Sequence, residues 1–479
     1  MAGTVENIAK ASAAAAVVRD LVTRARGAQK IFGAYTQVGL DEAVSAAGWA
    51  IMEPARNRTL AELAVRDTGL GDVQDKVEKN HRKTLGLLRD LKGAISTGVI
   101  ADEPEQGIVE IAKPVGVVAA VVPSTNPGAT PANNIINALK CGNAIILSPS
   151  PKGYSTCAKL LEFVNAELER VGAPGDLVQM LPAPVTRELS SELMRQADLV
   201  VVTGSQANVR AGYSSGTPAL GVGAGNVAVI VDASADIDDA ARKIMRSKIF
   251  DNATSCSSEN SLIVLESVYE RMLSALGSQG GAMLSDAEKA TLGRVMFPEG
   301  KLSAAVTAQS ASRVCAIAGL TRPALVAAKC LMVEETGTGR EYPFSGEKLS
   351  PVLTIYKVRD FDHAVSIMRG IYDYMGNGHS CGIHTANEAH VDRLGREMTV
   401  CRVIVNQAHA IANGGSFDNG LPFSLSMGCG TWGGNSFSEN LNYRHFMNVT
   451  RIVRTIPLKE PSLDDVFGGY WAKYKIKKQ

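Results

Sequence analysis

The spacing of hydrophobic positions changes near residue 98 and divides the chain into two kinds of structure. Before that point, apolar side chains recur three and four residues apart, as in Leu60–Thr68 and Asp75–Leu91, which predicts helices with no candidate for chemistry. A polar stretch, 98–107, leads into the alternating segment Ile108–Pro114. This alternation predicts an exposed or interface strand.

Beyond residue 116, short continuous apolar runs alternate with helical segments. The expected strands are Val117–Val122, Asn143–Leu147, Leu199–Val202 and Val227–Val231. The expected helices are Pro131–Lys140, Ser155–Arg170, Gln206–Tyr213 and Ala235–Ile249. Continuous β-branched runs between helices predict a parallel sheet covered on both faces, and therefore an α/β fold.

A second α/β series begins near residue 256 and predicts a second domain. Its expected strands are Ser261–Leu265, Ala324–Ala327, Val352–Val358 and Val403–Val405. Near the end of the chain, Asn448–Arg454 is polar at alternate positions, and we expect it to pair with Ile108–Pro114 as a projecting ribbon. Because a ribbon with one apolar face needs a partner to cover it, we expect a homodimer or homotetramer.

The composition narrows the class of protein. The 479 residues carry 49 basic and 48 acidic side chains and are 45% hydrophobic, which suits two to three domains. This balance of charge gives no reason to expect nucleic acid or an acidic membrane as partner. No apolar run is long enough to span a membrane, and Ala11–Val18 fits a first helix better than a signal peptide or targeting helix. We therefore expect a cytoplasmic protein.

The spacing of cysteines and histidines predicts neither a metal site nor disulfides. The eight cysteines include no CxxC pair, and the seven histidines show no HxxxH or HExxH spacing. Cys256 differs from the others because it lies in the polar segment Asp251–Asn260, between a helix and a strand. Hydroxyls and backbone amides there can keep a thiolate accessible, although the segment alone also suits an ordinary loop cysteine.

Two further segments follow strands of the first sheet, where parallel sheets carry binding sites. Ser124-Thr125-Asn126-Pro127 closes the first strand, and Asn126 is either a turn former or an amide donor to an oxyanion. Thr203-Gly204-Ser205 lies between a strand and a helix N-terminus, whose free amides favour a phosphate. The glycine-rich segment 221–225 precedes a strand, so it lacks the context of a dinucleotide fingerprint.

Taken in order, these segments resemble the aldehyde dehydrogenase superfamily over nearly the whole chain. The segments that resemble its coenzyme-A-acylating branch are Phe250–Asn252, Glu347–Pro351, Gly376–His379 and Gly428–Ser436. Within that branch, Ser-Pro-Ser-Pro at 148–151 and the run 378–384 are most similar to members that act on sulfoacetaldehyde. Members that act on acetaldehyde or succinate semialdehyde are the alternatives.

The resemblance implies two Rossmann-like α/β domains with a projecting β-ribbon for oligomerisation. It assigns 1–100 and 116–240 to a dinucleotide-binding domain and 241–435 to a catalytic domain. It assigns 101–115 and 436–479 to the oligomerisation ribbon and tail. It also implies a reversible reaction in which a short aldehyde, NADP or NAD, and coenzyme A give an acyl-CoA.

The resemblance implies a chemical role for three side chains. Cys256 is the nucleophile that adds to the aldehyde, and the Asn126 side chain with the Cys256 backbone amide holds the oxyanion. Hydride then leaves to the nicotinamide, and coenzyme A attacks the remaining thioester. His379 is a proton shuttle for the thiol of coenzyme A, with a plain loop histidine as the alternative.

The resemblance also implies where the cofactor binds. It puts Ser148-Pro149-Ser150 beside the adenosine ribose, Gly204-Ser205 beside the pyrophosphate, and Glu347 on the nicotinamide ribose. The expected cofactor residues are Thr125, Ser148, Pro149, Ser150, Lys152, Thr203, Gly204, Ser205, Gly223 and Glu347. Because no acidic residue lies within Ser148–Ser155, whereas Lys152 could hold a 2′-phosphate, the sequence favours NADP over NAD.

One departure from the hydrolytic members concerns the second half of the reaction. Gly221 stands where those enzymes carry a glutamate as general base for water, so the thioester waits for a thiol such as coenzyme A. Glu259 could substitute for that base, but its position next to a strand favours a structural role. Arg402 or Arg444 could pair with an anionic substrate.

A cofactor-independent thiol acyltransferase that uses Cys256 and His379 is the alternative from another class. It would need neither Glu347 nor the phosphate-shaped loop at Gly204. Binding of NADH or NADPH therefore distinguishes the two hypotheses.

Overall fold

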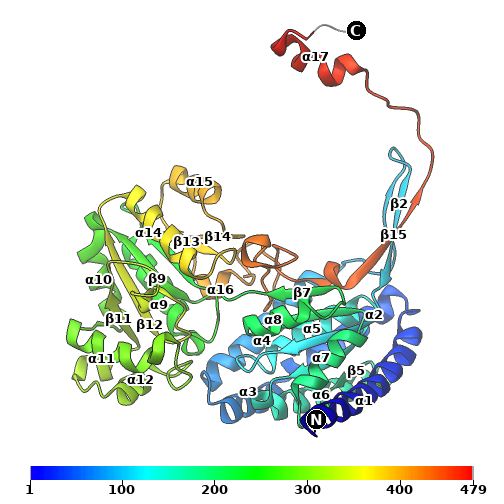
Figure 1. Cartoon of the computed structure of the whole chain (residues 1–479), viewed down its shortest axis with the longest axis horizontal. Coiled ribbons are helices and arrows are strands. Elements are labelled where there is room, and N and C mark those ends of the chain that lie inside the picture. The colour runs from blue at the N-terminus through cyan, green and yellow to red at the C-terminus, as the bar shows by residue number, and fades with distance from the viewer. Residues whose placement is uncertain (1, 477–479) are drawn as a thin grey trace.

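Two bodies, each built on a sheet, lie side by side in the computed structural model, and a thin arm projects from one of them (Figure 1). The structure describes the backbone of residues 2–476 and the side chains of residues 12–476. Residue 1 of the expected first domain and residues 477–479 of the expected tail lie outside the described residues.

The N-terminal region is helical, as predicted. Its helices are α1 (Ala2–Phe32), α2 (Gln37–Met52), α3 (Pro54–Thr68) and α4 (Val73–Leu91). Local capping sets where α4 begins, because the Asp72 side chain accepts a hydrogen bond from the Asp75 amide. This helix also buries Lys76, Lys79 and Lys83, which is unusual for charged side chains.

Within the described residues, the first sheet has five parallel strands in the order β5-β4-β3-β6-β7. These strands are β3 (Val117–Val122), β4 (Ala144–Pro149), β5 (Val178–Met180), β6 (Leu199–Thr203) and β7 (Ala219–Val222). The helices of this body are α5 (Ala129–Lys140), α6 (Tyr154–Arg170), α7 (Arg187–Gln196) and α8 (Gln206–Tyr213), besides α1 to α4. Helices on both faces leave β3 and β4 fully buried, which confirms the predicted covered sheet.

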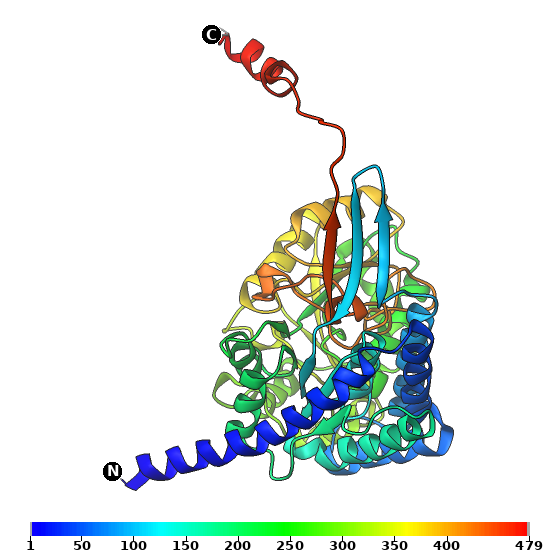
Figure 2. The same ribbon diagram turned by 90° about the vertical axis from the view of Figure 1, so that its right-hand side faces the viewer.

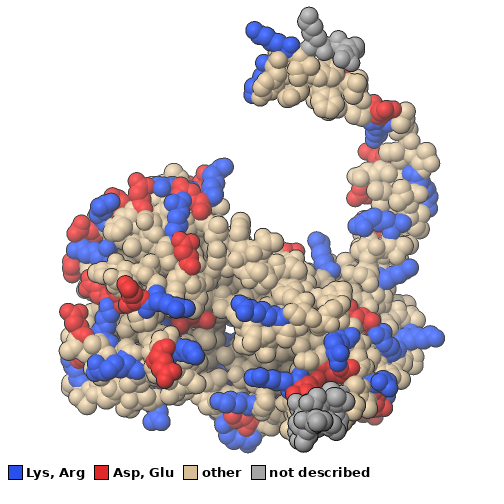
Figure 3. All heavy atoms as spheres, viewed as in Figure 1, with Lys and Arg blue, Asp and Glu red and all other residues tan. Residues whose placement is uncertain are grey.

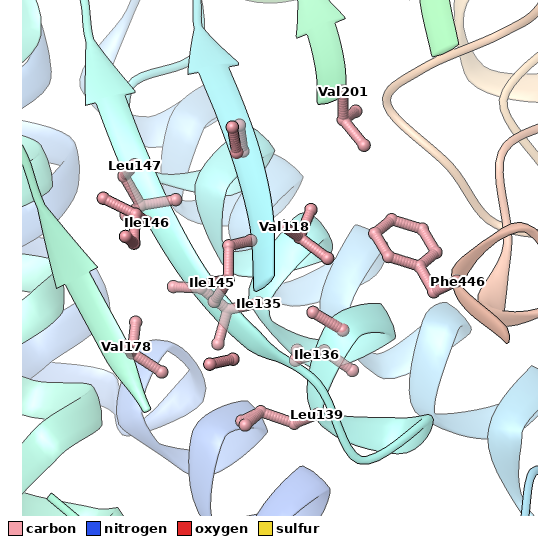
Figure 4. Close-up of a cluster of buried hydrophobic side chains, with 14 of the residues drawn as sticks. Val118, Ile135, Ile136, Leu139, Ile145, Ile146, Leu147, Val178, Val201 and Phe446 are labelled. Atoms are coloured by element: carbon pink, nitrogen blue, oxygen red, sulfur yellow. The ribbon is translucent and has the colours of Figure 1, made fainter. Parts of the chain in front are cut away.

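The core of this body combines distant parts of the chain. Val118 and Ile145 from the sheet pack against Ile135 of α5, and Phe446 joins them from the C-terminal region (Figure 4). Burying an aliphatic or aromatic side chain of this size stabilises the fold by about 1.5–3 kcal/mol.

The second sheet has seven parallel strands among the described residues, in the order β10-β11-β12-β9-β8-β13-β14. These strands are β8 (Val227–Val231), β9 (Glu259–Leu265), β10 (Gly281–Met283), β11 (Cys330–Glu334), β12 (Val352–Val358), β13 (Cys381–His384) and β14 (Val403–Val405). The accompanying helices are α9 (Ile237–Ile249), α10 (Tyr269–Ser278), α11 (Asp286–Met296), α12 (Ala311–Ala318), α13 (Pro323–Val326), α14 (Phe361–Tyr374), α15 (Glu388–Glu397) and α16 (His409–Ala412).

One predicted strand, Val227–Val231, is confirmed as β8 but lies in the other sheet, and one predicted strand, Ala324–Ala327, is wrong. Val227–Val231 pairs with β9 and β13, so it belongs to the second sheet, and the core changes between β7 and β8 rather than at residue 240. A fully buried parallel strand has the same apolar pattern in either sheet, so the pattern could not assign it. The segment Ala324–Ala327, which was expected to form a strand, lies mostly in helix α13 instead, because Pro323 favours the first turn of a helix.

The expected boundary at residue 435 also differs from the packing. Phe423 was expected in the second domain, but it packs in the core of the first body with Phe437 and Leu441. The chain therefore returns to the first body before residue 435.

An antiparallel ribbon projects from the first body, as predicted (Figure 2). In the described part of the chain it consists of β1 (Gly98–Glu103), β2 (Ile108–Pro114) and β15 (Met447–Val453), with β2 in the middle. The following helix α17 (Leu463–Tyr474) stands clear of both sheets (Figure 1). No helix within residues 2–476 is long and apolar enough to cross a membrane.

Candidate active site

Cys256 and His379 lie next to each other, in two loops that border the second sheet. Cys256 lies in the turn between α9 and β9, and His379 lies just before β13. The Cys256 Sγ and His379 Nε2 atoms are 3.4 Å apart, although the residues are 123 positions apart in sequence. On the other side of the ring, His379 Nδ1 is 2.7 Å from Ser380 Oγ, which holds Nε2 toward the thiol.

Both members of this pair are held in their neutral forms. Burial raises the pKa of the Cys256 thiol to about 12, and Glu347 and Cys429 act in the same direction. Burial lowers the pKa of His379 well below its usual value, and Arg402 and His409 lower it further. At neutral pH a thiol therefore faces a neutral imidazole, which can accept the thiol proton as a general base.

An uncommon backbone turn positions the cysteine. Asp251, Asn252 and Ala253 have φ angles of 51°, 50° and 58°, in the left-handed region. This conformation costs roughly 1–2 kcal/mol per residue. The start of α4 holds the turn, because the Asp72 amide donates to Asp251 Oδ1 at 2.8 Å and the Asp251 amide donates to Asp75 Oδ2 at 2.7 Å.

Two lysines of α4, where the sequence indicated no chemistry, connect this turn to Asn126. The Nζ atoms of Lys76 and Lys79 both form ion pairs with Asp251 Oδ2. Lys79 Nζ also donates to Asn126 Oδ1 and to Thr254 Oγ1, each at 3.0 Å. Because the lysine occupies the amide oxygen, the amide nitrogen of Asn126 faces away from it, as an oxyanion donor requires.

No part in the site was expected for these lysines, because charged side chains on a helix usually face solvent. The signal that could have found them is their spacing, since Lys76, Lys79 and Lys83 recur at intervals of three and four and so share one helix face.

Glu347 has the character expected of a residue that binds a ribose. Its Oε1 atom is buried and has no hydrogen-bond partner among the described residues. Burial raises the pKa of this carboxyl to about 8, against the opposing effects of Lys248 and Lys348. An acceptor without a donor fits a ligand hydroxyl group, so these residues suit a nucleotide ribose.

The end of β4 contains the expected adenosine residues. Ser148 is buried, and its Oγ lies 2.9 Å from Ser190 Oγ, so its hydroxyl is engaged within the protein. Pro149 is the last residue of β4, and Ser150 begins the short turn that carries the exposed Lys152. Lys152 and Ser150 are therefore better placed than Ser148 to meet a ligand.

The expected pyrophosphate segment is open. Gly204 and Ser205 are exposed, and the Ser205 side chain caps α8 by accepting the amide of Asn208. The free amides of the first turn can therefore face an anion. The Thr203 hydroxyl faces the protein interior, where its Oγ1 lies 2.7 Å from Ser426 Oγ.

The remaining expected cofactor residues make backbone contacts. The Thr125 carbonyl accepts a hydrogen bond from Lys76 Nζ at 3.2 Å. The Gly223 amide donates to Asn435 Oδ1 at 3.2 Å. Both residues therefore lie in segments that neighbouring side chains hold in place.

Gly221, which the resemblance places at the position of a catalytic carboxylate, packs closely against α8. A side chain at Gly221 would meet Val209 and Tyr213 of α8, at 2.7 and 2.8 Å from its Cβ, rather than Cys256. Gly225 is the residue that faces the cysteine, and a Cβ there would lie 2.2 Å from the Cys256 carbonyl oxygen. No carboxylate can replace Gly225, so this segment still lacks a base for water.

Glu259 and Arg402 have structural contacts. Glu259 accepts hydrogen bonds from Ser247 Oγ and the His409 amide, in agreement with the structural role expected for it. Arg402 is buried, and the acceptors of its guanidinium are His379 O, Gly428 O, Ser438 O and Asn440 Oδ1. These hydrogen bonds hold Arg402 against the loop around His379. Its contacts therefore differ from those expected of a residue that pairs with an anionic substrate.

The described cysteines at all eight positions are free, and no group of three His, Cys, Asp or Glu side chains in the described chain could hold a metal ion. The site therefore offers a thiol, an imidazole, an amide and a carboxylate as its chemical groups.

Comparison with known proteins identifies the family. Residues 2–324 match the model of the aldehyde dehydrogenase family. The chain belongs to this family. It is 62% identical to the acylating sulfoacetaldehyde dehydrogenase of Cupriavidus necator, over 97% of this chain and 94% of the relative. It is 38% identical to the acetylating succinate-semialdehyde dehydrogenase of Clostridium kluyveri, over 94% and 99%.

A solved structure supports the same assignment for this aldehyde dehydrogenase. The acetylating aldehyde dehydrogenase of Geobacillus thermoglucosidasius superposes with a TM-score of 0.90 at 34% identity, covering 94% of this chain and 99% of that one. The predicted membership of the acylating branch and the predicted aldehyde dehydrogenase-like α/β fold are confirmed.

Proposed function

We propose that this enzyme oxidises sulfoacetaldehyde to sulfoacetyl-CoA, with NADP or NAD as hydride acceptor and coenzyme A as acyl acceptor. The contact between Cys256 Sγ and His379 Nε2, 3.4 Å apart, carries the proposal, and Lys79 ties Asn126 to Thr254 in the cysteine loop. Identity of 62% to a sulfoacetaldehyde enzyme, against 38% to a succinate-semialdehyde enzyme, supports the choice of aldehyde.

The residues of the site supply each step that the protein must perform. Cys256 loses its proton to the neutral His379, and the sulfur adds to the aldehyde carbon. The Asn126 amide and the Cys256 backbone amide then stabilise the oxyanion, a contact typically worth on the order of 3–4 kcal/mol. The nicotinamide, when bound, accepts the hydride from this hemithioacetal.

Coenzyme A completes the cycle. His379 first passes the Cys256 proton to solvent, so that its imidazole can accept the proton of the incoming thiol. The sulfur of coenzyme A then attacks the Cys256 thioester. The bond from the acyl carbon to the Cys256 sulfur breaks, and the thiolate of the enzyme is released. Water competes poorly because Gly225 leaves no room for a carboxylate base beside Cys256.

The cofactor is proposed to bind Glu347 through its nicotinamide ribose and the exposed Gly204-Ser205 turn through its pyrophosphate. The exposed Lys152 supports NADP, because an ammonium group can pair with a 2′-phosphate. On this view the first body binds most of the dinucleotide, and the second carries Cys256 and contributes Glu347 to the nicotinamide ribose.

The ribbon and the free cysteines bear on assembly and location. Exposed Val99, Ile452 and Val453 support the proposal that the ribbon joins subunits into a homodimer or homotetramer.

The eight free cysteines, all within the described chain, support a reducing compartment, and we place the enzyme in the cytoplasm.

The contact of Cys256 with His379 would also suit a cofactor-independent acyltransferase. The buried Glu347 Oε1, with no partner among the described residues, favours the dehydrogenase, because an acyltransferase has no use for an open ribose acceptor.

The proposal is tested by following nicotinamide reduction with sulfoacetaldehyde, acetaldehyde and succinate semialdehyde, with NAD and NADP in parallel, and with and without coenzyme A. We expect strict dependence on coenzyme A and the highest kcat/KM for sulfoacetaldehyde. Rapid turnover without coenzyme A would exclude the acylating reaction. Failure of NADH and NADPH to quench the protein fluorescence would favour the acyltransferase.

A further inference from the structure

Lys83 is a buried cation of α4 with no carboxylate partner. Its Nζ atom donates to the Gly414 carbonyl, and no ion pair is formed by this lysine among the described residues. The Phe423 ring lies with its centroid 5.5 Å from Nζ. Because an ammonium group has three N–H donors, two remain without an acceptor in the described protein.

Lys83 is linked to the segments that carry the reacting groups through α4 and through the loop at Gly414. It is one helical turn beyond Lys79, which holds Asn126. Its acceptor Gly414 follows Asn413, whose amide nitrogen donates to Ser257 Oγ at 3.0 Å, next to the nucleophile. Burial lowers the pKa of Lys83, and Arg82 and Lys79 lower it further, so the ammonium form lacks the stabilisation that an anion would give it.

The buried face of α4 carries an excess of positive charge. Among the described residues, Lys76 and Lys79 share the carboxylate of Asp251, and Lys83 has none. A buried cation without an anion is unfavourable, and a bound anion would remove that penalty. The two arginines that the sequence offers as partners of an anionic substrate differ from Lys83: Arg402 donates to four protein acceptors and leaves only its Nε without one among the described residues, and Arg444 is exposed beside Tyr443.

We propose that Lys83 binds the sulfonate group of the substrate and so sets the preference of the enzyme for an anionic aldehyde. This inference rests on the proposed function. A sulfonate is a permanent anion with oxygen acceptors, which matches a desolvated ammonium with unused donors. A short neutral aldehyde offers Lys83 no charge, so it gains nothing from this contact.

The first test compares substrates. Lys83→Met removes the charge and keeps the length of the side chain, and Lys83→Gln is a second variant in case the first folds poorly. We expect the ratio of kcat/KM for sulfoacetaldehyde to kcat/KM for propionaldehyde to fall about 10- to 100-fold, the range for a hydrogen bond to a charged group. Lys140→Met is the matched control.

Lys140 is also a buried lysine, but it pairs with Asp41 at the far end of α5. Its loss should lower the thermal midpoint without changing the ratio. If a folded Lys83 variant keeps the wild-type ratio, the proposal is overturned. If the wild-type enzyme does not oxidise sulfoacetaldehyde at all, the proposed function fails instead.

The second test measures binding of the anion alone. Ethanesulfonate has the sulfonate but no aldehyde, and we expect it to inhibit propionaldehyde oxidation competitively. The inhibition constant should rise at least about tenfold in Lys83→Met and stay unchanged in Lys140→Met. Equal inhibition of the wild type and Lys83→Met would refute the role of Lys83 whatever the natural aldehyde is.

Discussion

Cys256 depends on its surroundings for reactivity, because its own thiol is a weak nucleophile at neutral pH. Burial, rather than a neighbouring cation, dominates its pKa of about 12. His379, neutral and 3.4 Å away, is the group positioned to accept the proton. The fold therefore holds the proposed nucleophile in its thiol form and places the proposed base beside it.

This arrangement predicts a steep pH dependence of the free enzyme. A raised pKa means that the thiol form dominates below about 12, and the thiolate fraction grows as pH rises. We expect alkylation of Cys256 by iodoacetamide to accelerate about tenfold per pH unit between about pH 6 and pH 9. Cys256→Ser provides the background from the other cysteines, and a plateau below about pH 8 would contradict the raised pKa.

Lys79 is the residue that orients Asn126. In Lys79→Met the Asn126 amide loses the partner that fixes its direction, and we expect kcat for hydride transfer to fall about 10- to 100-fold, with a smaller change in KM. Single-turnover kinetics of NADPH formation measure this step.

A double-mutant cycle with Asn126→Ala separates orientation from general damage. If Lys79 acts through Asn126, adding Lys79→Met to Asn126→Ala should lower the rate no further. Lys76→Met removes a contact with the same Asp251 carboxylate but none with Asn126. We therefore expect its loss of rate to be at least about tenfold smaller than that of Lys79→Met. Fully additive losses would show that Lys79 serves stability alone.

At the scale of elements, the site depends on loops that pack together: Cys256 and His379 precede the amino ends of β9 and β13, whereas Asn126 follows the carboxyl end of β3. The left-handed turn Asp251–Ala253 presents Cys256, and the segment between β7 and β8 packs against its backbone. Helix α4 holds this turn from the first body through Lys76, Lys79 and Asp75. These contacts connect the two bodies at the point where the chemistry is proposed to occur.

Gly225→Ala tests this close packing. The added Cβ would lie 2.2 Å from the Cys256 carbonyl oxygen, so the backbone must move. We expect a loss of about 1–3 kcal/mol in unfolding free energy and a large loss of turnover. Urea denaturation and steady-state kinetics measure both effects.

Gly277→Ala is the control because this helical position of α10 has no atom within 4 Å of the added Cβ. It should stabilise the protein by about 0.4–1 kcal/mol without affecting turnover. Wild-type activity in Gly225→Ala would show that the cysteine loop does not need this contact.

At the scale of the whole molecule, two bodies with mixed surface charge carry a ribbon whose base packs on the first body and whose far end projects from it. Lysine, arginine, aspartate and glutamate are interspersed over the face shown in Figure 3, in agreement with a formal net charge of +1. The apolar positions on the ribbon stand out against this surface. Val453 is 71% exposed at the end of β15, and α17 exposes Leu463, Val466 and Tyr470.

Val453→Asp tests the role of the ribbon in assembly. An exposed side chain of one chain tolerates a charge, but a buried interface position does not, so we expect a lower molar mass by light scattering. Val326→Asp, an exposed valine of α13 in the other body, should leave the mass unchanged. An identical mass for both variants and the wild type would exclude this part of the ribbon from the subunit interface.

Much of the fold followed from local pattern. Three predicted elements have both bounds right, because the side chains that each buries leave an apolar periodicity in its own sequence. They are Val117–Val122 (β3), Gln206–Tyr213 (α8) and Val352–Val358 (β12). The assignment of Val227–Val231 to a sheet failed, since a strand covered on both faces carries no mark of its neighbours.

The sequence by itself determined most element types, the family and the choice of Cys256, Asn126 and His379 as candidates, because these depend on local spacing and on ordered motifs. Only the tertiary structure decided which groups support them. Lys79 and Asn126 are 47 positions apart, and Asp251 lies 172 positions from Lys79. Such contacts leave no periodic trace in the chain, because they arise only when packing buries the charges together and requires each to find a partner.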